Sequence, residues 1–421
     1  GLDIDKRAAQ FAYFSVMMKA REYDSGFFGR KNIPQPRVYD IQESNWLGGA
    51  YKHEMGNFLN SQQHRDTLNY LLDTFVDAKE YGSILQIKPL DYEGLKEAWE
   101  TSAAATAGDI NMVMWYGAAK DAVAQLIEQA IMLSQKYDAV VTNPPYMGAS
   151  GMGAPLANFV KKYYPDSKSD LFAVFIEVCS RMAGENRYQA MITQHAWMFL
   201  SSYEKLREKM MLTETVNMAH LGARAFEEIG GEVVQTTSFV RCRTHIDGYK
   251  GTYCRLIEPT FQQGKEDMFL SGENRYFANQ DNFAKIPGRP FAYWMSPAVF
   301  YDYRRGTPLG DIAAPRKGNS TSDNNRFLRL WSEVDANKMN LHSDNITAED
   351  SMKKRWYPYN KGGGYRKWYG FNEYLIDWYD DAAEIRKIKT AVIANYQYFM
   401  KPGLTWSTVS SKKFSIRWFD K

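Results

Sequence analysis

The chain has 421 residues, of which 44% are hydrophobic and 24% are charged, and its formal net charge is +3 at pH 7. The length exceeds that of one ordinary domain, and the apolar content is enough for sizeable cores, so we expect two globular domains. No apolar run approaches the length of a membrane-spanning helix, and the mean hydropathy is −0.50, which excludes a membrane partner.

Cysteine and histidine usage gives no sign of a metal site. The three cysteines, Cys179, Cys242 and Cys254, lack the spacing of metal ligands, and the six histidines show no zinc-type pairing. Few cysteines without a disulfide framework fit a reducing compartment. We therefore expect no metal and a cytoplasmic location.

The N-terminal residues 1–5 read as a short strand that ends in an acid, followed by a helix over 6–22. Asp5 has the position of a helix N-cap. The following segment has helical periodicity at 57–77 and 116–136, so we interpret about 25–136 as a helical insertion.

A strand is predicted over residues 137–142, directly before Asn143-Pro144-Pro145-Tyr146. The pair Val140-Val141 indicates a buried strand, and the two prolines forbid its continuation in a sheet or a helix. Open α/β sheets bind ligands where the chain leaves the carboxyl end of a strand. This turn offers an amide side chain, an uncommitted backbone carbonyl and an aromatic ring.

These three groups suit the methylation of an exocyclic amino group on a planar heterocycle. The lone pair of adenine N6 is delocalised into the ring, so the nitrogen is a poor nucleophile until acceptors pull it toward tetrahedral geometry. The Asn143 side-chain oxygen and the Pro144 carbonyl can each accept one amino hydrogen. Tyr146 would stack on the extruded base, a contact worth about 1 to 3 kcal/mol.

The order of the next elements predicts a doubly wound parallel sheet. Residues 170–182 have an apolar stripe at helical spacing, and 188–192 read as the next strand, which gives the order strand, helix, strand. Further predicted elements are a helix over 195–209 and strands over 215–221, 236–243 and 251–257. We expect the last of these strands to pair with the one before it as a hairpin across 245–248.

Basic charge and tryptophan gather toward the C-terminus. From His245 onward there are 27 Lys plus Arg against 20 Asp plus Glu, whereas the residues before it have 25 against 29. Seven of the 11 tryptophans are there too, interleaved with cations in 353–357, 365–369 and 412–418. Cations can neutralise phosphates while rings stack on bases. Composition alone leaves open a β-rich domain with an aromatic core and a solvated basic rim.

At residues 143–146 the chain resembles the S-adenosylmethionine-dependent N6-adenine DNA methyltransferases, whose catalytic motif is Asn/Asp-Pro-Pro-Tyr/Phe. With residues 1–5, 230–237 and 323–329, the resemblance extends to the PglX-type adenine-specific methyltransferases of phage growth limitation and BREX defence systems, and to type IIG restriction-modification enzymes. It spans most of the chain. It implies methylation of host DNA as a self mark, with other phage-defence proteins as partners.

The resemblance implies an α/β fold with a Rossmann-like, doubly wound methyltransferase sheet in residues 1–260, interrupted by the helical insertion. An α+β target-recognition domain that binds double-stranded DNA would follow in 261–421. Family members carry a strand and a Gly-rich loop just before the N-terminal acid, and this sequence begins after them. We therefore expect residues 1–421 alone to be N-terminally truncated, to bind S-adenosyl-L-methionine poorly and to be inactive.

The resemblance also assigns site residues. Asp3 matches the acid that accepts hydrogen bonds from the cofactor ribose, and Phe226 is the candidate that faces the flipped base opposite Tyr146. The full cofactor set is Asp3, Ile4, Ser83, Leu85, Asn143 and Phe172. The DNA-binding candidates are Arg316, Lys317, Asn319, Asn324, Arg326, Lys361, Arg366 and Lys367.

These assignments have alternatives in which the residues have purely structural roles. Asp3 can be an acidic residue of a turn that binds no ligand, and Phe226 can pack its loop against the core. Phe172 is better explained by core packing. For the whole chain, the alternatives are a catalytically silent DNA-binding or assembly module and a glutamine-N5 protein methyltransferase. The second alternative needs no large basic, tryptophan-rich domain, so we disfavour it.

Overall fold

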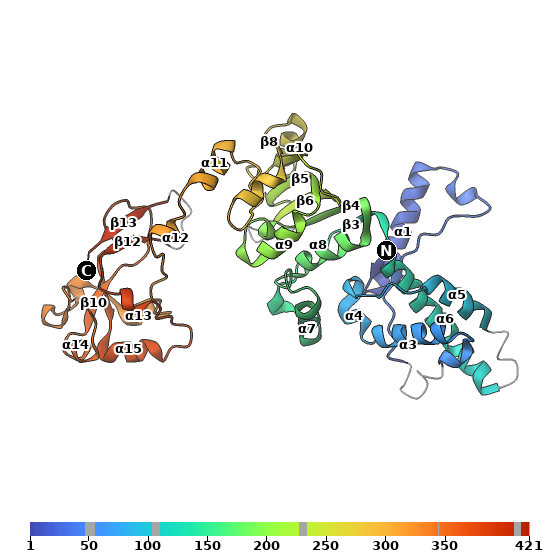
Figure 1. Ribbon diagram of the computed structural model, residues 1–421, viewed down its shortest axis with the longest axis horizontal. Helices are drawn as coiled ribbons and strands as arrows, with labels where there is room; N and C mark the ends of the chain where they lie inside the picture. Colours follow the sequence, from blue (N-terminus) through green and yellow to red (C-terminus); the bar gives the residue numbers. More distant parts are fainter. Residues whose placement is uncertain (47–54, 103–109, 227–233, 344, 408–413, 421) are drawn as a thin grey trace. The chain divides into compact units, whose positions relative to one another are not determined.

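The computed structural model describes residues 1–46, 55–102, 110–226, 234–343, 345–407 and 414–420. The chain divides into two compact units, residues 1–306 and 307–421 (Figure 1). Residues 261–306 therefore belong to the first unit, and the structural division falls after the predicted one at 260.

A mixed sheet forms the centre of the first unit. Among the described residues it has six strands in the order β3-β4-β6-β5-β7-β8. Their bounds are β3 (Tyr137–Thr142), β4 (Ala183–Gln194), β5 (Glu214–Ala223), β6 (Gln235–Cys242), β7 (Gly251–Arg255) and β8 (Arg275–Ala278). The pairs β3/β4 and β5/β7 are parallel, and the other three pairs are antiparallel. This is a Rossmann-like α/β arrangement, but the sheet is mixed rather than parallel.

The predicted strands are present, whereas the predicted hairpin is wrong. The strand β7 pairs in parallel with β5, with Asn217 opposite Thr252, and does not follow β6 as an antiparallel neighbour. The physical reason is that β6 is already paired on both sides, with β4 and with β5. The next strand must therefore join the free side of β5.

The prediction that β3 is buried is also wrong. Val141 is 75% exposed and Val140 is only half-buried. The cause is that β3 lies at the edge of the sheet, where it pairs only with β4 among the described residues. A pair of adjacent valines occurs in this edge strand just as it would in a buried strand, so the sequence pattern did not distinguish the two.

Helix α8 (Leu171–Met182) packs on β3 and β4, as the order strand, helix, strand requires. Asp170 is its N-cap and accepts a hydrogen bond from Phe172 N. The expected helix over 195–209 is wrong in part, because two 3-10 turns, η6 (His195–Met198) and η7 (Ser201–Tyr203), precede the short helix α9 (Glu204–Met210). In η6 the side chain of Trp197 is fully buried in the core beneath the sheet.

The N-terminal strand and helix are as predicted. Strand β1 (Leu2–Asp3) pairs in parallel with β2 (Tyr39–Asp40), and α1 (Lys6–Tyr23) follows. Asp5 caps α1 by accepting from the backbone amides of residues 7 and 8, because the first amides of a helix have no partner within it.

The helical insertion forms a core of its own. Its helices are α3 (Gln62–Thr74), α4 (Ala78–Tyr81), α5 (Tyr92–Thr101) and α6 (Ile110–Ser134). Buried apolar residues from α3, α5 and α6 form one cluster, as the helical periodicity predicted. Figure 1 shows these three helices beside one another. The other helices of the first unit are α7 (Ala154–Tyr163), α10 (Gln262–Ser271) and α11 (Pro297–Arg305).

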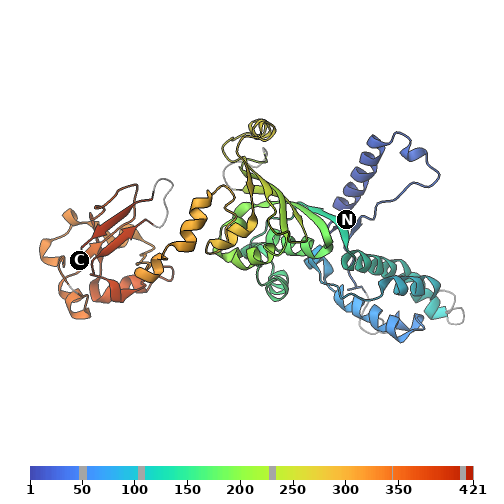
Figure 2. The ribbon, with the colours of Figure 1, turned by 45° about the horizontal axis from the view of Figure 1, so that its top comes forward.

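The second unit combines short strands with short helices. Its strands are β9 (Leu328–Leu330), β10 (Trp356–Tyr359), β11 (Tyr374–Asp377), β12 (Gly403–Trp406) and β13 (Ile416–Phe419). The first three form an antiparallel sheet in the order β10-β11-β9, and β12 pairs with β13 (Figure 2). Its helices are α12 (Leu309–Ile312), α13 (Asn324–Phe327), α14 (Ala348–Lys353) and α15 (Tyr379–Arg386). Around Tyr357 and Trp378 lies a separate core.

We predict that Trp197→Ala lowers the free energy of unfolding of the first unit by about 3 to 5 kcal/mol, the usual cost of removing a buried large aromatic side chain. The Trp197 ring contacts Phe239 and Phe291 at centroid distances of 5.5 and 4.8 Å, and its Nε1 donates to Thr193. Urea denaturation followed by circular dichroism measures the loss. Trp46→Ala is the matched control, because Trp46 is exposed and should cost under about 0.5 kcal/mol. Equal effects of the two variants would contradict the assignment of Trp197 to the core.

Candidate active site

The turn after β3 leaves the sheet at an open edge. Strand β3 ends at Thr142, which lies opposite Met191 of β4, and Asn143 is the first residue beyond it. Strands β3 and β4 are parallel, and β4 and β5 are both antiparallel to β6, so the carboxyl ends of all three strands share one edge. The side chain of Asn143 is exposed at this edge, whereas Pro144 is buried beneath it.

Two acceptors at this turn are uncommitted. Among the described residues, neither the Asn143 side chain nor the Pro144 carbonyl makes a hydrogen bond. An exposed amide oxygen and a free carbonyl one residue apart can accept the two hydrogens of one amino group. The turn thus presents two hydrogen-bond acceptors that the described residues leave unused.

Asp170 clamps the turn to the start of α8. Its Oδ1 accepts from Met147 N at 3.0 Å and from Phe172 N at 3.3 Å. The backbone adds Leu171 N to the Met147 carbonyl at 3.0 Å and Ala149 N to the carbonyl of residue 169 at 3.0 Å. Burial raises the pKa of Asp170, and the amides that donate to it oppose that rise. The clamp joins the loop after the prolines to a helix of the core.

Tyr146 is held as a neutral, half-buried ring. Its ring meets Phe172 edge-on, with centroids 6.1 Å apart and planes at 83°. Burial, followed by the charge of Asp170, raises the pKa of Tyr146 to about 12. The buried Tyr146 hydroxyl has no hydrogen-bond partner among the described residues. The position of the ring is therefore set by packing rather than by its hydroxyl.

The predicted cofactor residues near the N-terminus lie beside one another. Asp3 is exposed at the end of β1, and its Oδ1 accepts from Asp5 N at 2.8 Å. Ile4 is 55% exposed, and its Cγ2 would lie 3.0 Å from a Cβ added at Gly82, which has a φ of +57°. The 3-10 turn η3 (Gly82–Ile84) thus lies close to Ile4, and the positive φ of Gly82 favours glycine at that position.

Side-chain packing connects this turn to the clamp. The core cluster that contains Ile84 also contains Leu171, the first residue of α8, and the Tyr164 hydroxyl donates to the Ile84 carbonyl at 2.8 Å. Leu171 is in turn hydrogen-bonded to Met147. The turn at 82–84 and the loop after the prolines are therefore joined through Leu171.

The residues present fit an adenosyl cofactor in part. An exposed carboxylate at Asp3, an exposed aliphatic side chain at Ile4 and the half-buried Ser83 can contact a ribose and a flat heterocycle. Leu85 and Phe172 are 4% and 0% exposed, so their side chains belong to the core. For Phe172 the structure agrees with the alternative of core packing.

Phe226 is half-buried in a bend that follows β5 at the same edge as Asn143. Residues 230–233, which belong to the segment 230–237 that carries part of the family resemblance, lie outside the described residues. Gly148, Gly151 and Gly153 precede a helix, α7, that the sequence did not reveal.

A series of hydrogen-bonded polar side chains at this edge was not predicted from the sequence. His195 follows the last residue of β4, and its Nδ1 lies 2.7 Å from His220 Nε2 of β5. His220 Nδ1 lies 3.0 Å from the Tyr293 hydroxyl. The position of His195 directly after a predicted strand was the available signal, but its partners are far away in the sequence.

The predicted DNA-binding residues divide by their contacts in the second unit. Arg326 pairs with Glu384 at 2.7 Å, and Arg366 pairs with Glu373 at 3.3 Å. Asn324 is exposed but accepts from the Thr321 hydroxyl, and Asn319 is half-buried. The candidates without an ion pair among the described residues are Arg316, Lys317, Lys361 and Lys367. Three of these cations lie over aromatic rings, Arg316 over Tyr398, Lys361 over Tyr374 and Lys367 over Trp368, and none of the four is neutralised by an acid among the described residues.

An open pocket of about 520 Å³ adjoins Arg366. It is lined by Trp331, Arg366, Tyr369, Gly370, Phe371, Asn372 and Glu373. The rings of Trp331 and Tyr369 are 60% and 61% exposed. Behind it the buried Arg417 guanidinium lies 4.7 Å from the Phe371 ring and has no hydrogen-bond acceptor among the described residues.

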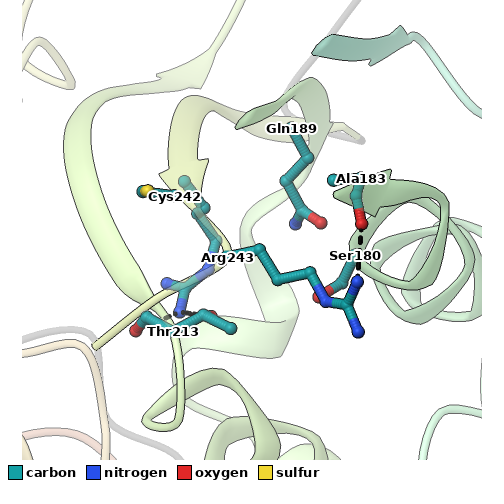
Figure 3. Close-up of a pocket in the computed structure, with 7 residues that line it drawn as sticks. Ser180, Ala183, Gln189, Thr213, Cys242 and Arg243 are labelled. Carbon is teal, nitrogen blue, oxygen red and sulfur yellow. Dashed lines mark hydrogen bonds between the residues drawn. The ribbon is translucent and has the colours of Figure 1, made fainter. Parts of the chain in front are cut away.

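A second pocket lies in the first unit, at the edge of the sheet opposite Asn143 (Figure 3). Gln189 lies opposite Arg241 on the neighbouring strand, and the Arg241 guanidinium donates to the carbonyl and hydroxyl of Thr213. Arg243 donates to the Ala183 carbonyl at 2.7 Å (Figure 3). The pocket has no room for a water molecule, so we interpret it as structural.

No group of three or more potential metal ligands occurs among the described residues. Cys179, Cys242 and Cys254 are all free and buried. None of the helices in the described ranges is long and apolar enough to cross a membrane.

Comparison with known proteins identifies relatives over the whole chain. The model of the Eco57I restriction-modification methylase family matches residues 1–222. The chain is 40% identical over 442 residues to the adenine-specific methyltransferase PglX of Lacticaseibacillus casei (strain Zhang), and 39% identical over 446 residues to the adenine-specific methyltransferase BrxX of Escherichia coli O9:H4 (strain HS). The matches cover 99% and 100% of this chain but 35% of each relative.

Among solved structures, the type IIL restriction-modification enzyme MmeI in complex with DNA matches 60% of this chain and 31% of its own, with 14% identity and a TM-score of 0.35. The nuclease-deletion mutant of the type ISP enzyme LlaGI matches 41% and 19%, with 12% identity and a TM-score of 0.31.

We predict that Asp170→Ala destabilises the first unit by about 0.5 to 2 kcal/mol, because it removes an N-cap acceptor and leaves Met147 N without a partner. Asp170→Asn is the matched control, since it keeps an oxygen acceptor at the same place. Urea denaturation gives the free energies, and hydrogen exchange reports protection of the Met147 amide. Wild-type protection of that amide in Asp170→Ala would show that the clamp does not hold the turn.

Proposed function

The chain belongs to the Eco57I restriction-modification methylase family, and from this premise we propose that it forms part of an S-adenosylmethionine-dependent N6-adenine DNA methyltransferase. The chain spans 35% of the length of its two named relatives, so the proposal concerns the full-length protein. The observation that carries it is the pair of acceptors at the carboxyl edge of the sheet, the exposed Asn143 side chain and the carbonyl of the buried Pro144, neither of which makes a hydrogen bond among the described residues.

The two acceptors perform the central step. Asn143 Oδ1 and the Pro144 carbonyl each accept one hydrogen of the adenine amino group, and this favours a pyramidal nitrogen whose lone pair points toward the methyl donor. Bound S-adenosylmethionine supplies an electrophilic methyl group on its sulfonium. The amino nitrogen would bond to the methyl carbon as the carbon–sulfur bond breaks, which leaves a neutral thioether, and it would then release one proton to solvent. The protein needs no metal and no catalytic carboxylate for this reaction.

Tyr146 and Phe226 hold the extruded base. The half-buried Tyr146 ring is fixed by packing against Phe172, so stacking on it costs little additional ordering. Phe226 follows β5 at the same edge and would close the base from the other side. Pro145, exposed between Pro144 and Tyr146, keeps the turn stiff.

Asp3, Ile4 and Ser83 form the part of the cofactor site that this chain contributes. Asp3 accepts hydrogen bonds from the ribose hydroxyls, and the exposed face of Ile4 packs against the adenine of the cofactor. In this proposal Asn143 also contacts the cofactor. Leu85 and Phe172 contribute through the core that supports these residues.

The second unit is proposed to bind the double-stranded DNA around the target adenine. Residues 307–421 contain 19 Lys plus Arg against 13 Asp plus Glu. Arg316, Lys317, Lys361 and Lys367 supply cations for phosphates, and Arg366, Asn319, Asn324 and Arg326 are candidates for further contacts. In this proposal the methylated DNA serves as a self mark, with other phage-defence proteins as partners in the cytoplasm. The family assignment does not favour a silent assembly module or a glutamine methyltransferase.

We predict that Asn143→Ala in the full-length protein lowers methyl transfer to DNA at least about 100-fold, because one of the two amino-group acceptors is lost. Asn143→Asp keeps an oxygen acceptor and should retain measurable activity. Transfer of labelled methyl groups to duplex DNA is the assay, and DNA affinity should change little in either variant.

The matched control for this experiment is Asn158→Ala, because Asn158 is exposed on α7 away from the turn. It should label DNA like the wild type. Equal labelling by Asn143→Ala and Asn158→Ala would remove Asn143 from the mechanism.

We predict that Lys367→Ala weakens binding to all duplex sequences alike and lowers the slope of log affinity against log salt concentration by about 0.9, the effect of losing one phosphate contact. Lys353→Ala is the control, because Lys353 already pairs with Glu349 at 2.6 Å. Fluorescence anisotropy of the full-length protein with labelled duplex, between about 50 and 200 mM salt, gives both slopes. An unchanged slope for Lys367→Ala would exclude Lys367 from the phosphate contacts.

A further inference from the structure

Three polar side chains form a buried chain beside the proposed base site. His195 Nδ1 lies 2.7 Å from His220 Nε2, and His220 Nδ1 lies 3.0 Å from the Tyr293 hydroxyl. His220 and Tyr293 are 4% and 3% exposed, whereas His195 is half-buried in η6. The ring of Phe199 meets both imidazoles, so packing as well as hydrogen bonding holds the pair in place.

All three groups are neutral at pH 7. Burial lowers the pKa of His195, and burial together with the charges of His195, Arg255 and Lys265 lowers the pKa of His220 to about 3. Burial also raises the pKa of Tyr293 above its ordinary value. Each imidazole therefore carries one N–H and one bare nitrogen, and each of the two links contains a single hydrogen.

The direction of the chain follows from the buried hydroxyl. Among the described residues the Tyr293 hydroxyl has no hydrogen-bond partner other than His220. If His220 donated to Tyr293, the hydroxyl hydrogen would be left without an acceptor inside the protein, which is costly. The hydroxyl therefore donates to His220 Nδ1, and His220 Nε2–H donates to His195 Nδ1.

This direction makes His195 Nε2 a donor. Its Nδ1 already accepts from His220, so the remaining proton of the neutral ring is on Nε2. That atom makes no hydrogen bond with the described residues. The chain thus presents one oriented N–H group that has no acceptor within the protein.

The N–H group lies at the same edge of the sheet as Asn143. His195 follows Gln194, the last residue of β4, and β4 is the parallel neighbour of β3. Thr142, which precedes Asn143, lies opposite Met191. Asn143 comes one residue after Thr142 and His195 four residues after Met191, so the two residues follow neighbouring strand ends at the same edge of the sheet.

We propose that His195 Nε2–H donates a hydrogen bond to a ring nitrogen of the extruded adenine, and that His220 and Tyr293 are positioning residues that hold its tautomer. The inference rests on the proposed function and adds a determinant of base choice to it. An adenine presents an amino donor beside ring acceptors, and the site presents two acceptors and one donor. A thymine or guanine, whose Watson–Crick edge carries a ring N–H and a carbonyl oxygen in place of these groups, leaves the site's polar groups unpaired.

The test compares kcat/KM of the full-length protein on duplexes whose target adenine is replaced by 1-deaza-, 3-deaza- or 7-deazaadenine. In the wild type, one of the three substitutions should lower kcat/KM about 10- to 100-fold beyond the other two, because it removes the acceptor. His195→Ala should show a loss of similar size on ordinary DNA and no additional loss on that one analogue. His195→Gln, whose amide N–H reaches a similar position, should recover part of the activity.

The positioning residues are tested with a matched pair of tyrosine variants. Tyr293→Phe removes the hydroxyl that orients the chain, so it should raise KM and weaken the response to the sensitive analogue. Tyr276→Phe is the control, since the Tyr276 ring lies 5.7 Å from the Tyr293 ring but its hydroxyl makes no hydrogen bond among the described residues. It should behave like the wild type.

The outcomes separate this inference from the proposed function. If the wild type labels no adenine in any duplex, the proposed function itself fails. If the wild type labels DNA but responds alike to all three analogues, the hydrogen bond from His195 does not exist, and this arm is independent of how any variant folds. Wild-type kcat/KM for His195→Ala on every substrate would also overturn the inference.

Discussion

The site depends on the inability of two consecutive prolines to continue a β-strand. Pro144 lacks the amide that a ladder with β4 would need, so the chain must turn away one residue after Thr142. Asn143 is thereby left at the rim of the sheet with its side chain exposed. The Asp170 carboxylate then fixes the residues that follow by accepting from Met147 N and Phe172 N. The proline rings thus create the opening at the edge of the sheet, and the buried Asp170 carboxylate fixes the conformation of the loop that follows.

Features with local causes could be predicted from the sequence. The bounds 137–142 of the strand before the prolines were found, because turn residues terminate it, and the cap of α1 by Asp5 follows from a preference that acts over three residues. The motif at 143–146 could be recognised because it is a run of four consecutive residues. Helix α8 differs from its predicted range by a single residue at its start.

Features with non-local causes could not be predicted. The exposure of Val141 depends on whether another strand lies beside β3, and the pairing of β7 with β5 depends on the place that β6 already occupies. The chain from His195 to Tyr293 joins residues 25 and 73 positions apart, on three different segments. No pattern within one segment carries that information.

In the second unit, composition gives the number of charged residues but not which of them form ion pairs with one another. Arg355 pairs with Asp377 at 2.6 Å and lies against the rings of Trp356 and Tyr379, so this cation and these rings are part of the packing of the unit itself. Lys367 and Lys317 have no such acid among the described residues. Some of the interleaved cations and rings therefore belong to the packing of the unit, and DNA binding by the remaining cations stays a prediction.

The exposed edge of β3 has a practical consequence for handling this chain. Val141 is apolar and 75% exposed on a strand that pairs on one side only among the described residues. Such an edge recruits strands from other molecules, and charged side chains are the usual protection against it. Preparations of residues 1–421 therefore carry an unpaired apolar position on this edge, and Val141→Lys would add a second charge to the strand beside the exposed Asp138.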